Sequence, residues 1–290
     1  MLLTILESSP VSDRIALQLQ YLMPKKAMTW LAGRIAGARG GAVTRAIIQN
    51  FVTRYSVDMG EAENSDIGSY ATFNEFFTRP LKAGARTLAQ ADWICPVDGA
   101  VSQFGKITSG HIFQAKGHHY SARALVGGDA ALAAQFDDGH FACLYLSPKD
   151  YHRIHMPSAG TLRRMVYVPG DLFSVNPATA RGVPGLFASN ERVVCVFDTP
   201  HGPFVHVLVG ATIVGSMATV WHGVVNPPRT RDARQWDYAG DVALKQGDEM
   251  GRFLLGSTVV MLWPKGPVTF NPAWAPGQAI RLGEAMANAA

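Results

Sequence analysis

Cysteine is scarce in this sequence, and the few that occur form no motif. Cys95, Cys143 and Cys195 lie far apart in apolar stretches, and no C-x-x-C pair is present. An odd, scattered set argues against a disulfide framework and against a cysteine-bound metal. We therefore expect reduced, buried thiols in an intracellular protein.

Long apolar runs are also missing. A membrane-spanning helix needs about 20 apolar residues. The nearest candidate, residues 204–221, is interrupted by His206, Gly210 and Gly215, and its Val, Thr and Ile content favours strands. Residues 1–6 are apolar but too few for a secretory signal, and they have no basic flank. We expect neither a signal peptide nor a transmembrane helix.

Charge is low overall, and its positive excess is confined to one end. Charged residues make up 17% of the 290 residues and hydrophobic residues 48%, which excludes a disordered chain. The formal net charge is +4, and residues 1–60 alone hold seven Lys or Arg against three acids. A basic end of this kind suggests an anionic partner, either a membrane or a nucleic acid.

Residues 1–57 are predicted to form amphipathic helices. Three segments, 10–23, 27–36 and 42–57, place their apolar residues on one face, and Pro24 ends the first. Val43, Ile47 and Phe51 are spaced four apart in the third segment. These helices could cover a core, or they could lie in a membrane interface with Lys and Arg at anionic lipid.

Residues 58–70 are polar, and the rest of the chain, to residue 290, has the pattern of a β domain. Short runs rich in Val, Ile and Phe alternate with Gly and Pro turns, such as the turn at 198–203. The expected strands are residues 141–146, 164–168, 193–197, 204–209, 211–220 and 258–263. We predict an α+β fold, with a mostly antiparallel β catalytic domain after the N-terminal helices.

Three stretches contain residues that could perform chemistry. Asp98 precedes Gly99 in what is more often a plain turn. His152 and His155 are three apart, so a helix would place them on one face and a strand on opposite faces. Gly256-Ser257 precedes a run of β-type residues.

Several functions remain open on these residues alone. Either histidine could act as acid or base, whereas a zinc site would need a third ligand, so we expect no metal. Asp98, His155 and Ser257 could form the triad of a hydrolase acting on lipid or peptide, although triads are defined by geometry. A non-catalytic, peripheral lipid-binding module is a further possibility.

Taken together, the motifs resemble those of the pyruvoyl-dependent phosphatidylserine decarboxylases of bacteria (type I, prokaryotic). The resemblance extends over almost the whole chain, and the 255–258 stretch, Leu-Gly-Ser-Thr, is its most diagnostic part. The matching stretches are 72–77 with 79–80, 97–99, 115–118, 145–157, 167–176, 186–187, 190–192, 209–216 and 251–258. Lys149, Pro177 and His119 depart from the family pattern.

The resemblance implies a chain that makes its own cofactor. Ser257 would attack the carbonyl of Gly256, and cleavage there would give a β chain, 1–256, and an α chain, 257–290, whose first residue becomes a pyruvoyl group. Asp98 and His155 would serve Ser257 as a charge relay. The pyruvoyl ketone would form a Schiff base with the amine of phosphatidylserine, and His152 would assist the loss of carbon dioxide.

The resemblance also implies the partners and the location. The expected enzyme is a carboxy-lyase that converts phosphatidylserine to phosphatidylethanolamine. It would be peripheral, bound through residues 1–57 to anionic lipid at the cytoplasmic face of the cell membrane. Its two chains would stay together and pair as a homodimer, and no nucleic acid is expected as a partner.

Overall fold

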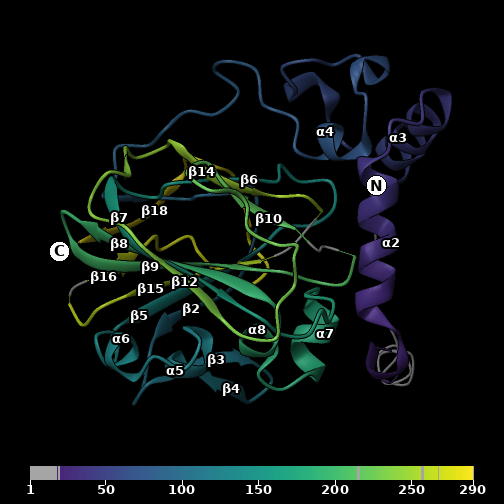
Figure 1. Cartoon of the computed structure of the whole chain (residues 1–290). Coiled ribbons are helices and arrows are strands. Elements are labelled where there is room, and N and C mark those ends of the chain that lie inside the picture. The colour runs from purple at the N-terminus through teal and green to yellow at the C-terminus, as the bar shows by residue number, and fades with distance from the viewer. Residues whose placement is uncertain (1–17, 19, 214–215, 256–257, 267, 290) are drawn as a thin grey trace.

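The fold is dominated by antiparallel β-sheets, with helices at the N-terminus and on one side (Figure 1). The computed structural model describes residues 18, 20–213, 216–255, 258–266 and 268–289. Every strand pairing between named strands in these ranges is antiparallel. The predicted α+β class is confirmed.

The largest sheet has nine strands, and a strand from the C-terminal part of the chain lies near its middle. Its order is β12-β7-β8-β9-β15-β5-β2-β17, with β13 beside β7. The bounds are β2 (Gly99–Lys106), β5 (His140–Tyr145), β7 (Gly160–Val168), β8 (Arg192–Thr199), β9 (Gly202–Val209), β12 (Arg234–Asp237), β13 (Ala243–Leu244), β15 (Thr258–Trp263) and β17 (Ala279–Ile280).

Three smaller sheets complete the β structure. One has the order β11-β10-β14-β6, one β1-β18-β16, and the third is the β3-β4 hairpin. The bounds are β1 (Trp93–Ile94), β3 (His111–Ala115), β4 (His118–Ser121), β6 (Arg153–His155), β10 (Met217–Thr219), β11 (Gly223–Val224), β14 (Glu249–Phe253), β16 (Val268–Phe270) and β18 (Ala285–Ala289).

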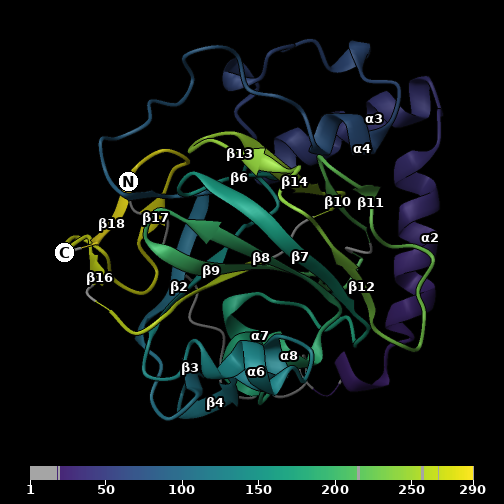
Figure 2. The ribbon, with the colours of Figure 1, turned by 60° about the vertical axis from the view of Figure 1, so that its left-hand side comes forward.

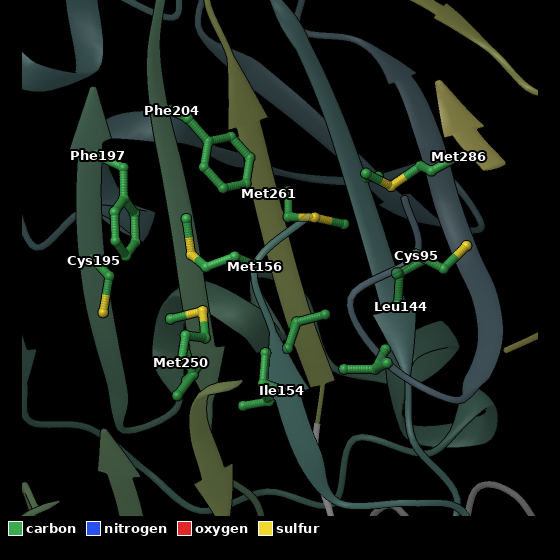
Figure 3. Close-up of a cluster of buried hydrophobic side chains, with 14 of the residues drawn as sticks. Cys95, Leu144, Ile154, Met156, Cys195, Phe197, Phe204, Met250, Met261 and Met286 are labelled. Atoms are coloured by element: carbon green, nitrogen blue, oxygen red, sulfur yellow. The ribbon is translucent and has the colours of Figure 1, made fainter. Parts of the chain in front are cut away.

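Strand β15 is buried on both faces, which explains why its sequence is apolar without alternation. Val259, Met261 and Trp263 point into one core cluster, and Val260 and Leu262 point into another. The first cluster lies between the large sheet and the four-stranded sheet. Figure 3 shows part of it, with Ile154 and Met250 of the smaller sheet facing Met261.

Short helices and the β3-β4 hairpin cover the other face of the large sheet, below it in Figure 2. The helices are α5 (Ala122–Leu125), α6 (Ala130–Ala134), α7 (Pro177–Gly182) and α8 (Leu186–Ser189). Residues of these helices, among them Leu125, Leu132 and Leu186, belong to the same buried cluster as Val260. The large sheet is therefore the middle layer of the β-rich part of the chain.

The N-terminal helices lie against one end of the β structure (Figure 1). Helices α2 (Lys25–Gly37) and α3 (Ala42–Tyr55) agree with the second and third predicted segments, whereas most of the first, 10–23, lies outside the described residues. A third core cluster joins them to α4 (Phe73–Phe77) through Ile48 and Phe76. No helix in the described ranges is long and apolar enough to cross a bilayer.

Two predicted segments differ from the structure. The strand expected at 211–220 shortens to β10, because the chain turns at Ile213, whose backbone N–H donates to Thr29 Oγ1 of α2 at 3.1 Å. The polar segment 58–70 contains two 3-10 turns, η1 (Met59–Glu61) and η2 (Ile67–Ser69). The preceding aspartates accept the backbone N–H groups of Gly60 and Gly68, as cap residues do.

Candidate active site

Asp98 lies immediately before β2 and is held by an arginine. Its Oδ1 accepts from Arg86 Nε at 3.0 Å and from the backbone N–H of Leu282 at 2.8 Å, and its Oδ2 accepts from Arg86 Nη2 at 2.5 Å. Arg86 also donates to Glu61 at 2.7 Å. The hydrogen bonds from Arg86 to Asp98 and Glu61 raise the pKa of Arg86, so this network keeps a permanent positive charge at Asp98.

His155 lies on β6, and its two ring nitrogens have different partners. Because Ile154 points into the core, its neighbour His155 faces the opposite side of the strand. Its Nδ1 is 2.7 Å from the carbonyl of Gly247, which can only accept, so Nδ1 bears the proton. Nε2 is then the basic nitrogen, and it accepts from the Tyr151 hydroxyl at 3.1 Å.

Asp98 and His155 are neighbours but do not hydrogen-bond to each other in the described part of the chain. The backbone N–H of His155 donates to the carbonyl of Pro96 at 2.9 Å, which brings β6 beside the segment that carries Asp98. Burial lowers the pKa of His155, and the charge of Asp98 opposes this as a minor cause. Asp98 and His155 thus lie close together, but the carbonyl of Gly247 binds the His155 Nδ1–H that a charge relay would direct to Asp98.

His152 is fully buried just before β6. Its Nδ1 donates to the carbonyl of Asp150 at 2.7 Å, and its ring centroid lies 4.0 Å from that of Phe77 in α4. Its Nε2 has no partner among the described residues, and burial lowers its pKa to about 3. His152 is therefore a neutral imidazole with one nitrogen free to accept a hydrogen bond. The two histidines have separate surroundings, as an extended segment predicts.

Gly256 and Ser257 lie outside the described residues, but their surroundings on both sides are described. Before them, the backbone N–H of Phe253 donates to the carbonyl of His152 at 3.0 Å. After them, Thr258 begins β15 opposite Tyr145 of β5 and Val209 of β9. Thr258 is fully buried, and its Oγ1 has no partner in the described ranges. The described residues on either side of the predicted cleavage site are thus Phe253, bonded to His152, and Thr258, at the start of a central strand.

Two cavities lie near the start of this strand. One of about 530 Å³ is lined by Asp98, Tyr151 and Arg79, and one of about 260 Å³ by Phe77 and Leu255 among others. Tyr145, the register partner of Thr258, lines both. A small molecule in either cavity would therefore lie close to the start of β15.

Sequence reasoning missed several residues that these contacts single out. Arg86, Tyr151 and Gly247 bond to the predicted site residues, and Arg79 lines the larger cavity. Tyr151 and Arg79 lie within the motifs of the family resemblance, which was their only signal. Arg86 and Gly247 meet the site through tertiary contacts that no local pattern reveals.

The described residues offer no metal site. No group of three or more His, Cys, Asp or Glu side chains in those ranges could hold a metal ion. Cys95, Cys143 and Cys195 are free and buried, and burial raises the pKa of each thiol. They are therefore inert thiols rather than ligands.

The geometry defines an enzyme rather than a passive lipid-binding module. An imidazole buried with an unpaired nitrogen destabilises the fold, and such groups are concentrated where they react. His152 is such a case, with an unpartnered Nε2 and a ring packed on Phe77, which lines the smaller cavity.

The comparisons with known proteins give the family. The family model for phosphatidylserine decarboxylase matches residues 73–288, and a second model, described as PSD, matches residues 15–56. A phosphatidylserine decarboxylase proenzyme of Albidiferax ferrireducens is 74% identical over 95% of this chain and 97% of its own. That of Variovorax paradoxus is 70% identical, over 97% of this chain and 99% of its own. The chain belongs to the phosphatidylserine decarboxylase family.

Proposed function

We propose that this protein is a proenzyme that cleaves itself between Gly256 and Ser257 and then decarboxylates phosphatidylserine to phosphatidylethanolamine. The observation that supports this most is the family match over residues 73–288, in which Leu-Gly-Ser-Thr stands at the entrance to β15. Proenzyme relatives match nearly the full length of the chain at about 70% identity.

In the first reaction, Ser257 Oγ attacks the carbonyl carbon of Gly256. The acyl group of Gly256 then moves from the Ser257 nitrogen to the Ser257 oxygen and forms an ester. His155 takes the hydroxyl proton on Nε2, because its Nδ1–H is held by the Gly247 carbonyl. The Tyr151 hydroxyl donates to that Nε2 and so occupies it. Before Nε2 can accept the serine proton, this hydroxyl must rotate away, or it must relay the proton from Ser257 to Nε2. Elimination of the ester leaves a carboxylate on Gly256 and a dehydroalanine, which takes up water and releases ammonia.

The described neighbours fit a pyruvoyl group at position 257. Thr258, the next residue in the chain, has an unpartnered Oγ1, and His152, whose carbonyl binds Phe253, has a free Nε2, so both are polar atoms that a carbonyl-bearing group could satisfy. When present, the group supplies an electron sink for loss of carbon dioxide. His152 is neutral because it is buried, so it would take up a proton on its free Nε2 before passing it to the carbon that has lost the carboxylate.

We also propose that α2 and α3 bind the protein to an anionic membrane at the cytoplasmic face. Helix α2 buries Lys25, Thr29 and Ala36 but exposes large apolar side chains, the reverse of a helix that covers a core. Trp30 is 58% exposed and Leu31 54%. Arg34 lies beside the Trp30 ring at 5.1 Å, where it could meet lipid phosphate. A homodimer of the processed enzyme is part of the proposal on the family resemblance alone.

The mass of the purified polypeptides tests the proposal. Cleavage predicts a chain of residues 1–256 and a 34-residue chain whose blocked N-terminus reacts with ketone reagents. Ser257→Ala should remain a single chain and release no carbon dioxide from phosphatidylserine. An intact wild-type chain whose serine is phosphonylated by a fluorophosphonate would instead indicate a hydrolase.

A further inference from the structure

Arg79 is a buried cation that pairs with no carboxylate among the described residues. It follows α4 and is 4% exposed. Its Nη1 reaches the carbonyl of Phe76 at 3.5 Å, the limit of a hydrogen bond, while its Nε has no partner among the described residues. The guanidinium lies 5.3 Å from the Phe76 ring. Because a guanidinium has five donors and a fixed charge, most of its binding capacity is unused.

The nearby carboxylates are engaged by other groups. Asp98 and Glu61 both pair with Arg86, and Glu61 also pairs with Arg281. Asp150 accepts from the backbone and hydroxyl of Ser147. No ion pair to Arg79 occurs within the described ranges of the chain. A buried cation of this kind is costly unless an anion joins it.

Arg79 lines the 530 Å³ cavity, which also contains Lys149 and Tyr145. Lys149 is exposed, so it can reach an anion from the solvent side. Tyr145 is the register partner of Thr258 and thus connects the cavity with the start of β15. On the other side, Phe77 packs on His152, and the charge of Arg79 contributes to the low pKa of that histidine.

We propose that Arg79 and Lys149 bind the phosphodiester of the substrate headgroup in this cavity. This inference rests on the proposed function and names a binding site for its substrate. A phosphodiester is a better occupant than the substrate carboxylate for an energetic reason. A guanidinium that paired with the carboxylate would stabilise the charge that must be lost with carbon dioxide, whereas the phosphodiester keeps its charge throughout.

Steady-state kinetics on mixed micelles of phosphatidylserine test the site. Arg79→Gln should still cleave itself but show a KM raised about tenfold or more, because a charge-assisted contact is lost. Lys149→Gln, a change at an exposed residue, should fold normally and raise KM about threefold or more. The control is Arg163→Gln, since Arg163 pairs with Asp198 and is half exposed. It should leave KM unchanged.

Two soluble inhibitors identify the anion. Glycerophosphoethanolamine has the phosphodiester without the carboxylate, and L-serine has the carboxylate without the phosphodiester. Inhibition by the first should weaken in Arg79→Gln and in Lys149→Gln, and inhibition by the second should not change. Weaker inhibition by serine alone would overturn the phosphodiester assignment.

The failure of this inference differs from a failure of the proposed function. A wild-type protein that stays uncleaved or releases no carbon dioxide would refute the function itself. A wild-type protein that is active, with KM unchanged in a folded Arg79→Gln and in Lys149→Gln, would refute only the site. Should Arg79→Gln melt far below wild type, Arg79→Lys and Lys149→Gln would decide by the same KM measurement.

Discussion

Arg86 controls the position of the Asp98 carboxylate through two of its donors. Arg86→Gln keeps one neutral amide but loses the charge and the two-point contact, so Asp98 should turn toward other donors. We expect self-cleavage to slow about tenfold to a hundredfold, measured by mass spectrometry of freshly synthesised protein over time. Arg86→Lys should be intermediate.

Arg281→Gln is the matched control for Arg86. Arg281 bonds to Glu61 at 2.8 Å but not to Asp98. Its loss removes a charge near the same network without touching the aspartate, so cleavage should proceed as in wild type. Equal rates for Arg86→Gln and wild type would show that Asp98 does not depend on Arg86.

His206 should make the protein sensitive to acid. It is fully buried in β9, neither ring nitrogen has a partner among the described residues, and burial lowers its pKa from 6.5 to about 3. Below pH 6.5 the unfolded chain binds a proton that the folded chain does not, so stability falls as pH falls. From pH 6.5 to 5 the loss is about 2 kcal/mol for this one residue.

Urea unfolding of the uncleaved Ser257→Ala protein at pH 7, 6 and 5 checks this. Adding His206→Leu should remove about 2 kcal/mol of the loss at pH 5. Part of the acid sensitivity should remain, because His152 has a similarly low pKa of about 3. His111→Leu, at an exposed position of β3, should leave the pH dependence as it was. Identical pH profiles with and without His206 would contradict the argument.

At the scale of single residues, the sequence offered candidates for reactive residues but not the partners that hold their side chains. His152, His155 and Asp98 were recognisable because they fall in diagnostic motifs. Their partners come from distant positions: Arg86 reaches Asp98 across a loop, and Gly247 reaches His155 from 92 residues away. Such contacts exist only after the sheets have packed, so no local spacing could predict them.

Among the elements, α2 is the one whose exposed face is hardest to explain in water. Substituting Trp30, Leu31 and Ile35 by Ser together should reduce binding to vesicles of phosphatidylserine and phosphatidylcholine by about tenfold or more, because apolar area no longer enters the interface. Flotation in a density gradient measures the bound fraction. All three side chains are more than half exposed, so the fold should survive.

A surface control and a change of lipid complete this experiment. Val220→Ser with Val224→Ser alters two exposed apolar residues elsewhere and should leave flotation unchanged. Vesicles of phosphatidylcholine alone should bind wild type less, because Arg34 and its basic neighbours lose their anionic partners. Deleting the helices would be a weaker test, since Ile48 of α3 packs on Phe76 in a core. Undiminished flotation of the α2 variant would refute docking by this helix.

Strands were predictable from the sequence where their burial required a continuous apolar run. The apolar run 258–263 became β15 because both faces of the large sheet are covered. The run 211–220 is also rich in Val, Ile and Met, yet only Met217–Thr219 is a strand, since Thr29 of α2 accepts the backbone N–H of Ile213. An apolar pattern in the sequence indicates that a segment is buried. It does not indicate which neighbouring group will accept the backbone N–H groups of that segment.

At the scale of the whole molecule, strand pairing between the segments before and after residue 256 determines whether the fold survives cleavage. The segment after residue 256 supplies β15, β16, β17 and β18, and three of these pair with strands from the preceding part. Strand β15 lies between β9 and β5, and all six of its residues are buried. At about 1.5 kcal/mol or more for each large apolar side chain, this strand alone holds the chains together strongly. Cleavage should therefore leave the native structure assembled.

Refolding should then depend on concentration after cleavage and not before it. The Ser257→Ala chain carries β15 on the same polypeptide, so its refolding is unimolecular. Once cut, the 34-residue chain must find its place in the centre of the sheet by collision, because the covalent connection that gave a high effective concentration is gone.

We expect wild-type protein to elute as one native species that contains both chains and to separate only in denaturant. On dilution from denaturant, its recovered fraction should rise with protein concentration, whereas that of Ser257→Ala should not. Separation of the chains on a native column would show that β15 is not what joins them.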